Sequence, residues 1–587
     1  MKTEGKAIAS LIVVLISLLL SLQAPAELAA SGVPDPRFGV VEAHQAPSAA
    51  TSLGAGWTRV TFRWNEIQPN GPQEWQPVVI SDEQLANELA SGRQVVGLLV
   101  TTPGWATDLD VGPGVPRGLH LPADDPNNLW ASFVRTIVGR YAGRIDHWII
   151  WNEPDIPDTQ HMSWGGSVRD FVQLLQVAYT AAKETNPNSV IHMAAVTHWW
   201  DEDWFGQFLQ AVKTAPNAAT HNYYFDVATL HIYFQPETVY DITVHYRDMM
   251  RGHGLHKPIW IAETNAAPSQ DPAWPVPNAQ FSVSLQQQAA YIVQAFSLGI
   301  AAGAERIAVY KMADNETDRL ANPEPFGLVR SDGSRRPAFT AYQMATTYMS
   351  GFQEGQWERR DTISLVTIDR GDSTTTVAWA RTSEPQTAVI PARTTRALMV
   401  DSRGGARYIY PERGYYFVDL PGANCVQGCQ IGGAPAMLVE GAPAAADTAP
   451  TPRSPTPSIE TTKQQTAPVS RATSTLAPPT TSPPTEAPTY TPSPTATDTP
   501  TVTPSATATP SPTNTASPTI APTQTPSFTP TPKPSSTPTA MSLASPTPSP
   551  TPTLDHAAGR YRSWILIGLL MLGLGALAVA TVGGRRG

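Results

Sequence analysis

The chain has 587 residues, enough for more than one domain, and a formal net charge of −10. It lacks any block of basic residues, which argues against nucleic-acid binding, whereas its 16 tryptophans suit a protein that stacks on sugar rings. Residues 1–30 have the pattern of a signal peptide, with Lys2 and Lys6 before an apolar core and small residues at 24–26. An uncleaved anchor is the alternative, and the shortness of the apolar core disfavours it.

Between residues 31 and 351, short apolar strands alternate with amphipathic helices. We expect strands at 38–42, 57–64, 94–101, 148–151, 190–196, 225–233, 259–263 and 306–310, and helices at 81–90, 126–141, 167–185, 204–213, 239–250, 285–302 and 337–349. Such alternation predicts a parallel sheet, and eight units favour a closed (β/α)8 TIM barrel of the α/β class over an open sheet.

From residue 352 onward, apolar residues recur at every second position, as they do in β-strands. Alternating runs at 362–369, 374–381, 387–390, 397–401 and 415–420 predict a small antiparallel β-sandwich domain over residues 352–440. We interpret this domain as a support for the barrel, with glycan binding as the alternative. The two cysteines, Cys425 and Cys429, suit a local disulfide in an exported protein, although two free thiols are also compatible with the sequence. A zinc site would need further ligands nearby, so we predict no metal site.

Residues 441–562 are dominated by Pro, Thr, Ser and Ala. Such a segment cannot bury enough apolar surface to fold, so we expect a disordered linker that acts as an extended stalk. Residues 563–583 form an uncharged apolar stretch with the length of one transmembrane helix, and 584–587 would be a cytoplasmic tail. With the signal peptide, this order predicts an exported cell-surface protein, held by a single-pass membrane anchor with its barrel outside.

Two of the expected strands end in a glutamate. The apolar run at 148–151 leads into Asn152, Glu153 and Pro154, and proline cannot continue a central strand. The seventh expected strand ends in Glu263. Both glutamates should therefore lie at the C-terminal rim of the barrel, where barrel enzymes carry their active sites. Either one alone reads as a surface loop residue, but a pair about 5 Å apart suits a retaining glycosidase.

With both glutamates present, the chain resembles the clan A retaining glycoside hydrolases over about residues 36–350, and is similar to families five and thirty-nine. The resemblance implies that Glu153 is the proton donor and acid/base and that Glu263 is the nucleophile. It also implies that Asn152 binds the sugar 2-hydroxyl and that Tyr233 hydrogen-bonds the nucleophile. No cofactor is expected.

Further substrate-binding candidates follow from the same resemblance. His231 belongs to the His-x-Tyr pattern of the sixth strand, and Arg59 resembles the arginine that steadies the charge of the nucleophile, with Arg63 as its competitor. Ordinary core packing or a surface ion pair is the alternative role for each of them. Trp105, Trp199 and Trp274 are candidate stacking platforms for sugars, although packing is the commoner role of a lone tryptophan.

The sequence departs from the clan pattern at two strand ends. Thr101-Thr102-Pro103 stands where many family five enzymes have histidine, and Tyr310-Lys311 stands where many clan members have tryptophan. Lys311 suits an acidic sugar, or else an ion pair with Asp314 or another carboxylate at the rim.

These observations predict a monomeric cell-surface glycosidase that hydrolyses O-glycosidic bonds in a polysaccharide or oligosaccharide by double displacement. A catalytically silent, stalked glycan-binding protein is the alternative. The sugar, the linkage and endo or exo action do not follow from these residues.

Overall fold

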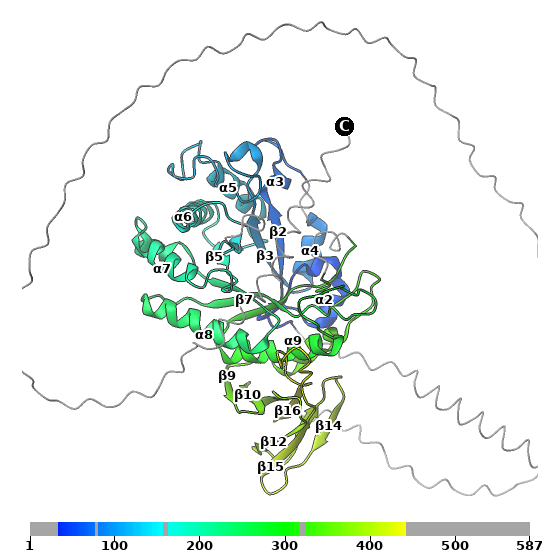
Figure 1. Cartoon of the computed structure of the whole chain (residues 1–587). Helices are drawn as coiled ribbons and strands as arrows, with labels where there is room; N and C mark the ends of the chain where they lie inside the picture. The colour runs from blue at the N-terminus through cyan, green and yellow to red at the C-terminus, as the bar shows by residue number, and fades with distance from the viewer. Residues whose placement is uncertain (1–32, 77–79, 157–162, 317–323, 442–587) are drawn as a thin grey trace, which may run out of the picture. The chain divides into compact units, whose positions relative to one another are not determined.

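A parallel barrel of eight strands forms the larger part of the computed structural model, which describes residues 33–76, 80–156, 163–316 and 324–441 (Figure 1). Its strands are β1 (Phe38–Val40), β2 (Trp57–Arg63), β3 (Gln94–Val100), β4 (His147–Asn152), β5 (Val190–Ala195), β6 (Ala228–Tyr233), β7 (Ile259–Asn265) and β8 (Arg306–Val309). The predicted barrel is therefore confirmed.

The strands pair in the order β5-β4-β3-β2-β1-β8-β7-β6, so the first and eighth strands lie side by side. The remaining edges, β5 and β6, are joined by two isolated parallel bridges, His192 to Val227 and Val196 to Leu230. The barrel is thus nearly closed, with its least regular pairing between β5 and β6.

Helices cover the outside of the barrel. They are α2 (Pro47–Leu53), α3 (Trp64–Ile67), α4 (Asp82–Ala90), α5 (Leu129–Tyr141), α6 (Val168–Thr185), α7 (Trp204–Thr214), α8 (Pro236–Gly252), α9 (Leu285–Ala301) and α11 (Pro337–Tyr348). α6 shows why the sequence forms them: a capping box between Ser167 and Asp170 starts the helix, and a stripe that includes Phe171 and Leu175 is buried.

Aromatic rings fill the barrel interior below the C-terminal rim. The rings of Trp57 and Trp260 lie 5.2 Å apart, and both side chains are fully buried. Gly39 makes room for the Trp57 ring, since a Cβ there would lie 2.2 Å from it. On the outer face of the strands, Gly97 does the same for Trp148, whose ring would lie 2.3 Å from a Cβ at that position. The packed interior supports the rim from below.

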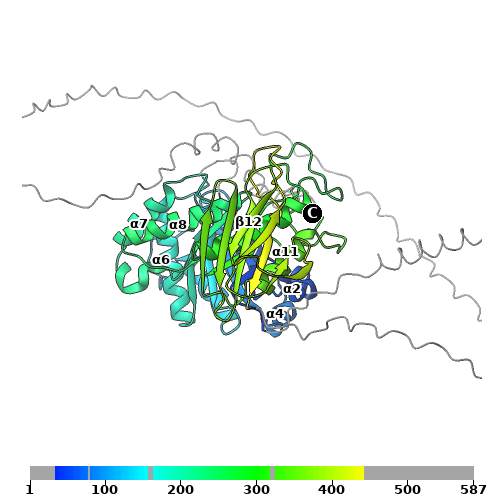
Figure 2. The same ribbon diagram turned by 90° about the horizontal axis from the view of Figure 1, so that it is seen from below.

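The antiparallel strands that follow the barrel form two sheets. They are β9 (Glu354–Arg359), β10 (Ile363–Asp369), β11 (Thr374–Ala380), β12 (Gln386–Pro391), β13 (Ala397–Val400), β14 (Ala406–Ile409), β15 (Tyr415–Leu420) and β16 (Ala436–Glu440). Six of them pair in the order β14-β13-β16-β11-β10-β9, and β12 pairs with β15. Figure 2 shows these strands side by side.

One face of the six-stranded sheet packs on the two-stranded sheet through a cluster that includes Leu365, Tyr416 and Leu438. The other face adds Val377 and Trp379 to the hydrophobic core of the barrel. Figure 1 shows α8 and α9 lying between the barrel strands and this domain. The antiparallel domain therefore shares a core with the barrel.

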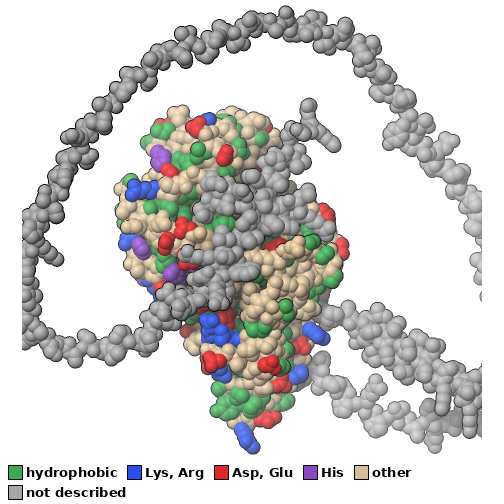
Figure 3. All heavy atoms as spheres, viewed as in Figure 1, with side chains coloured by type: hydrophobic (Ala, Val, Ile, Leu, Met, Phe, Trp, Pro, Cys, Tyr) green, Lys and Arg blue, Asp and Glu red, His purple; other side chains and the backbone are tan. Residues whose placement is uncertain are grey.

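The outer face of the two-stranded sheet carries apolar side chains beside one polar pair, Thr387 and Asp419. Val389 on β12 pairs in register with Phe417 on β15, and both side chains are exposed, as is Tyr415. Figure 3 shows hydrophobic side chains gathered at this end of the domain.

Cys425 and Cys429 are joined by a disulfide, with their Cα atoms 4.2 Å apart. Within residues 33–76, 80–156, 163–316 and 324–441, no helix is long and apolar enough to cross a membrane. The expected signal peptide, the linker from residue 442 onward, the anchor at 563–583 and the tail lie outside the described residues.

Candidate active site

The chain turns sharply at the end of β4, and this turn presents Glu153. Trp151 and Glu153 have φ angles of 77° and 47°, values that residues other than glycine rarely adopt. Hydrogen bonds hold the turn on both sides: the Glu153 N–H donates to the Ala195 carbonyl over 2.9 Å, and the Ser163 hydroxyl donates to the Glu153 carbonyl. Strained backbone conformations of this kind are held in place by the surrounding structure, and they are common in active sites.

Glu263 lies on β7 at an irregularity in the barrel. The pairing of β6 with β7 shifts register between Leu230 and His231, so that His231 stands opposite Glu263. The pairing of β7 with β8 is also irregular between Ile261 and Thr264. Bulges re-aim side chains beside active sites, and these two direct His231 and Glu263 toward Glu153.

The two glutamates and His231 form a compact buried cluster. One side-chain oxygen or nitrogen from each lies within 4.8 Å of those of the other two. His231 Nδ1 lies 2.7 Å from Glu153 Oε1 and 3.5 Å from Glu263 Oε2. The two strand-end carboxylates are therefore close together in the fold, although they are far apart in the sequence.

Arg59 on β2 orients this cluster. One terminal nitrogen of its guanidinium donates to Glu263 Oε1, and the other lies 3.3 Å from His231 Nε2. Because a guanidinium has only donors, Nε2 of His231 must accept. The imidazole proton is then on Nδ1, and His231 donates it to Glu153 Oε1.

Glu263 is held in its charged form. Burial opposes ionisation of its carboxyl, but the charge of Arg59, the neighbouring His231 and the hydrogen bonds from Tyr233 and Arg59 outweigh burial and lower its pKa below the usual value. The Tyr233 hydroxyl donates to Glu263 Oε2. Burial, together with the charge of Glu263, raises the pKa of Tyr233 well above its usual range, so this tyrosine is a neutral donor. An anionic, oriented Glu263 is suited to nucleophilic attack.

Among the described residues, Asn152, Trp105 and Arg63 make no hydrogen bond or ion pair with this cluster. Asn152 ends β4 and is half-buried. Trp105 is also half-buried; its Nε1–H donates to the Gln68 carbonyl over 2.6 Å, and its ring meets Trp64 edge-on. Arg63 approaches Glu66 at 3.8 Å, so Arg59 rather than Arg63 is the arginine at Glu263.

At the ends of β3 and β8, where the sequence departs from the clan pattern, the polar side chains bind neighbouring residues. Lys311 forms an ion pair over 3.3 Å with Glu42, which is a carboxylate at the rim. Asp314, the other expected partner of Lys311, binds Arg336 at 2.5 Å. Thr101 has a φ angle of 68°, and its hydroxyl contacts Asn65 at 2.7 Å.

Asp155 was not identified as a functional residue from the sequence, although it ends the same Asn-Glu-Pro-Asp segment. Its buried carboxylate accepts hydrogen bonds from the Thr197 N–H, the Thr197 hydroxyl and the His198 N–H, at 2.8, 2.7 and 3.1 Å. Burial, supported by the charge of Glu153, raises the pKa of Asp155 to about 7. Asp155 thus ties the turn that carries Glu153 to the loop after β5.

Part of the chain matches a known protein family. Residues 125–334, which include both glutamates, match the family model described as "Glycosyl hydrolase catalytic core". No curated protein matches the sequence. A family 39 glycoside hydrolase from the gut symbiont Bacteroides cellulosilyticus WH2 is similar in structure, with a TM-score of 0.51 and 15% identity over 69% of this chain and 81% of that chain.

Two further solved structures are less similar. A glucosidase from Croceicoccus marinus has a TM-score of 0.48 and 13% identity over 70% of this chain and 96% of its own. A monomeric beta-xylosidase from Caulobacter crescentus CB15 has a TM-score of 0.46 and 17% identity over 70% of this chain and 97% of its own.

The family match therefore covers the segment that carries both glutamates: residues 125–334 are similar to the catalytic core of the glycoside hydrolases. The family 39 structure shares the barrel fold with this chain, and the sequence resembles the clan A glycoside hydrolases, among them family thirty-nine.

Proposed function

We propose that this protein is a retaining glycoside hydrolase that cleaves O-glycosidic bonds in a polysaccharide by double displacement. The separation of the two glutamates carries the proposal, since an oxygen of Glu153 and an oxygen of Glu263 lie within 4.8 Å of each other. Retaining enzymes place their carboxyl groups roughly 5 Å apart, whereas inverting enzymes need roughly 6.5–9.5 Å to admit a water molecule.

In the first step, a Glu263 oxygen attacks the anomeric carbon while the glycosidic C–O bond breaks. Glu153 gives its proton to the departing oxygen, which leaves as a hydroxyl. His231 Nδ1–H occupies Oε1 of Glu153, so Oε2 is the atom that carries and delivers the proton. Arg59 and Tyr233 hold Glu263 in the attacking orientation.

In the second step, water attacks the anomeric carbon of the glycosyl-enzyme and the bond to Glu263 breaks. Glu153, now ionised, takes a proton from that water. Each displacement inverts the anomeric centre, so the two together restore the starting configuration. The negative charge then returns to Glu263, where Arg59 stabilises it.

We also propose that the catalytic domain lies outside the cell on a membrane-anchored stalk. The support is the order of segments in the sequence: a signal-like start at 1–30, a linker rich in Pro and Thr at 441–562, and an apolar stretch at 563–583. Protease treatment of intact cells should release an active fragment. If the protease releases no activity from intact cells and the activity appears only after lysis, the proposed location is wrong.

The stereochemical course tests the mechanism. A panel of glycans first identifies a substrate of the full-length protein, and NMR then follows the anomer that forms first. We expect the anomer of the substrate. A 2-deoxy-2-fluoro glycoside of the same glycone should label Glu263, and Glu263→Gln provides the unlabelled control. An inverted first product, or a label on another carboxylate, would contradict the proposal. Glycan binding without any hydrolysis would favour the silent binding protein instead.

A further inference from the structure

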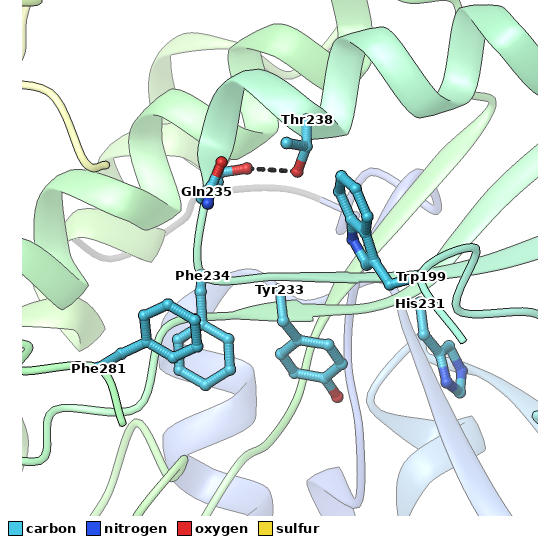
Figure 4. Close-up of a pocket in the computed structure, with 7 residues that line it drawn as sticks. All are labelled: Trp199, His231, Tyr233, Phe234, Gln235, Thr238 and Phe281. Atoms are coloured by element: carbon cyan, nitrogen blue, oxygen red, sulfur yellow. Dashed lines mark hydrogen bonds between the residues drawn. The ribbon is translucent and has the colours of Figure 1, made fainter. Parts of the chain in front are cut away.

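The aromatic pocket beside the two glutamates is too small for a sugar ring. Trp199, Phe234 and Phe281 line it together with His231 and Tyr233 (Figure 4). Its free space is about 10 Å³, which is room for about one water molecule. Within the described residues, the exposed aromatic rings lie instead on the antiparallel domain that follows the barrel.

These exposed rings are gathered in one short segment. Within the described part of the chain, the exposed side chains of Phe, Trp and Tyr are those of Tyr410, Tyr415 and Phe417, with exposed fractions of 69%, 45% and 52%. Tyr415 and Phe417 lie on β15, and Tyr410 lies in the segment that leads into it. Apolar surface that is concentrated in one place on a soluble domain commonly marks a binding site.

The two-stranded sheet presents Tyr415 and Phe417 on its outer surface, which we call the β12–β15 face. Three exposed pairs in register make up this face: Pro391 with Tyr415, Val389 with Phe417, and Thr387 with Asp419. Alternate residues on one strand are roughly 7 Å apart, so the two aromatic side chains form a strip longer than one ring. The strip ends at the polar pair.

The chemistry of this face suits a neutral sugar chain. The C–H groups on the face of a sugar ring are apolar and can cover an aromatic ring, while the hydroxyl groups point to the sides. Asp419 Oδ1 accepts the hydroxyl of Thr387 over 2.9 Å. A carboxylate has lone pairs for further donors, so Asp419 can also accept a sugar hydroxyl beside the aromatic strip.

The face is held rigid from below. The alternate side chains of the same strands, among them Ala388, Tyr416 and Val418, are buried in the core between the two β sheets. The Tyr416 hydroxyl donates to the Thr394 carbonyl over 2.7 Å. A ligand that binds to a preformed face does not have to order it, which lowers the cost of binding.

Area and charge argue against other occupants. Given their exposed fractions, Val389 and the three aromatic side chains offer on the order of 400 Å². A stable interface between two copies of the chain needs about 800 Å² on each partner. The Asp419 carboxylate would repel an anionic polysaccharide or an anionic lipid surface. A neutral glycan needs neither a larger area nor a positive charge.

We propose that the β12–β15 face binds a neutral polysaccharide chain, with Tyr415 and Phe417 as stacking residues and Asp419 as a hydroxyl acceptor. The inference goes beyond the proposed function, since binding at this face does not require hydrolysis. If the barrel cleaves the same polymer, the face holds the enzyme on its substrate and raises the local concentration of cleavable bonds.

Retention on insoluble polysaccharides tests this inference in the full-length protein, kept soluble by a mild detergent. The probes are cellulose, xylan and mannan, with cross-linked polygalacturonate as the anionic comparison. The wild type should bind at least one neutral polymer and should not bind polygalacturonate. For Phe417→Ala we expect the affinity for the neutral polymer to fall about 10-fold or more. Its kcat/KM on a small soluble glycoside should stay within about 2-fold of the wild type.

Two further variants make the comparison specific. Phe417→Tyr keeps an aromatic ring on the face and should retain most of the affinity. Val426→Ala removes an apolar side chain that is 88% exposed in the same domain but outside the face, and should leave the retention unchanged. All of these side chains are exposed, so thermal unfolding should show the same stability for each variant.

The outcomes separate this inference from the proposed function. Equal retention of the wild type and Phe417→Ala, or no retention on any neutral polymer, would overturn the binding face. A dimer in analytical ultracentrifugation that Phe417→Ala dissociates would overturn it too, and would assign the face to contacts between copies. Retention that depends on Phe417, in a protein that hydrolyses no glycan, would support the face and contradict the proposed function.

Discussion

Asp155 binds Thr197 at two atoms: Oδ2 accepts the backbone N–H over 2.8 Å and the side-chain hydroxyl over 2.7 Å. Asp155 follows Glu153 by two residues, and Thr197 follows β5, so this pair fastens two neighbouring strand ends together. Glu153 and His198, on either side of the contact, have φ angles of 47° and 72°. Each costs roughly 1–2 kcal/mol of backbone strain, which the hydrogen bonds of Asp155 help to offset.

Replacing Asp155 should change how stability depends on pH. Burial is the main cause that raises the pKa of Asp155 to about 7 in the folded protein, against about 3.9 in an unfolded chain. Between about pH 4 and 7 the folded state therefore holds the extra proton, and this residue makes the wild-type protein less stable as the pH rises. Asp155→Asn keeps an acceptor and cannot titrate. It should therefore remove this pH dependence, which amounts to a change in unfolding free energy on the order of a few kcal/mol between about pH 4 and 7.

Urea unfolding of the wild type and the variant at several pH values between 4 and 8 measures this effect. Asp124→Asn, which replaces an exposed carboxylate, is the control and should leave the slope unchanged. A slope in Asp155→Asn as steep as that of the wild type would show that Asp155 is not the group responsible.

The two catalytic glutamates should respond differently to substitution. Glu263→Gln should abolish turnover because an amide cannot form the glycosyl-enzyme. Glu153→Ala should slow hydrolysis most for poor leaving groups, which need the proton, by roughly 100-fold or more. Steady-state kinetics on the natural glycan and on an activated aryl glycoside measure the difference.

Azide gives a sharper result with Glu153→Ala. The truncated side chain leaves room for azide, which can attack the glycosyl-enzyme without a general base. We expect azide to restore turnover of the aryl glycoside and to give a glycosyl azide with the configuration of the substrate. Full activity of Glu153→Ala on a poor leaving group, without azide, would exclude Glu153 as the acid/base.

The barrel and its two glutamates could be predicted from the sequence because both depend on local patterns. Apolar runs that end in a carboxylate and a proline or polar residue mark strand ends, and parallel strands bring their ends to one rim. His231, Tyr233 and Arg59 were expected from the family resemblance, and the register shift that sets His231 opposite Glu263 is not visible in the sequence pattern. The structure brings all three into contact with a catalytic glutamate.

Contacts between distant segments could not be predicted in this way. The strands β9, β14 and β16 were missed, because β9 is mostly polar, β14 has only four residues, and β16 is a short run after the disulfide loop. Asp155 was not singled out because its partners, Thr197 and His198, lie in the loop after the next strand. The aromatic pocket likewise joins Trp199 to Phe281 from another loop.

Arg59 should control the acid limb of the pH–rate profile. Its charge is the largest of the interactions that lower the pKa of Glu263, so its removal should raise that pKa. Less of Glu263 would then be ionised at low pH. For Arg59→Met we expect the acid limb of kcat/KM to move to higher pH, together with a fall in kcat.

Arg63→Met is the matched control, since Arg63 lies on the same strand but faces Glu66. It should leave the profile in place. An acid limb that does not move in Arg59→Met would mean that another group sets the ionisation of the nucleophile.

The position of β16 predicts where the folded part of the chain can be cut. β16 lies between β13 and β11 in the six-stranded sheet and pairs with both. Met437 joins the core shared with the barrel, and Leu438 joins the core of the two β sheets. Glu440, its last residue, accepts the backbone N–H groups of Arg393 and Thr394. Removal of β16 would thus split the sheet and open both cores.

A protein that starts after the signal peptide and ends at residue 441 should therefore be soluble, cooperative in unfolding and active. A protein that ends at residue 433 should aggregate or unfold without a cooperative transition, because two strands lose their hydrogen-bonding partner and both cores are exposed. Met437→Ala in the longer protein tests the packing alone, and should cost roughly 2–5 kcal/mol of unfolding free energy without loss of the sheet. If the shorter protein folds with full stability, β16 is dispensable and the domain must be held by its contacts with α9.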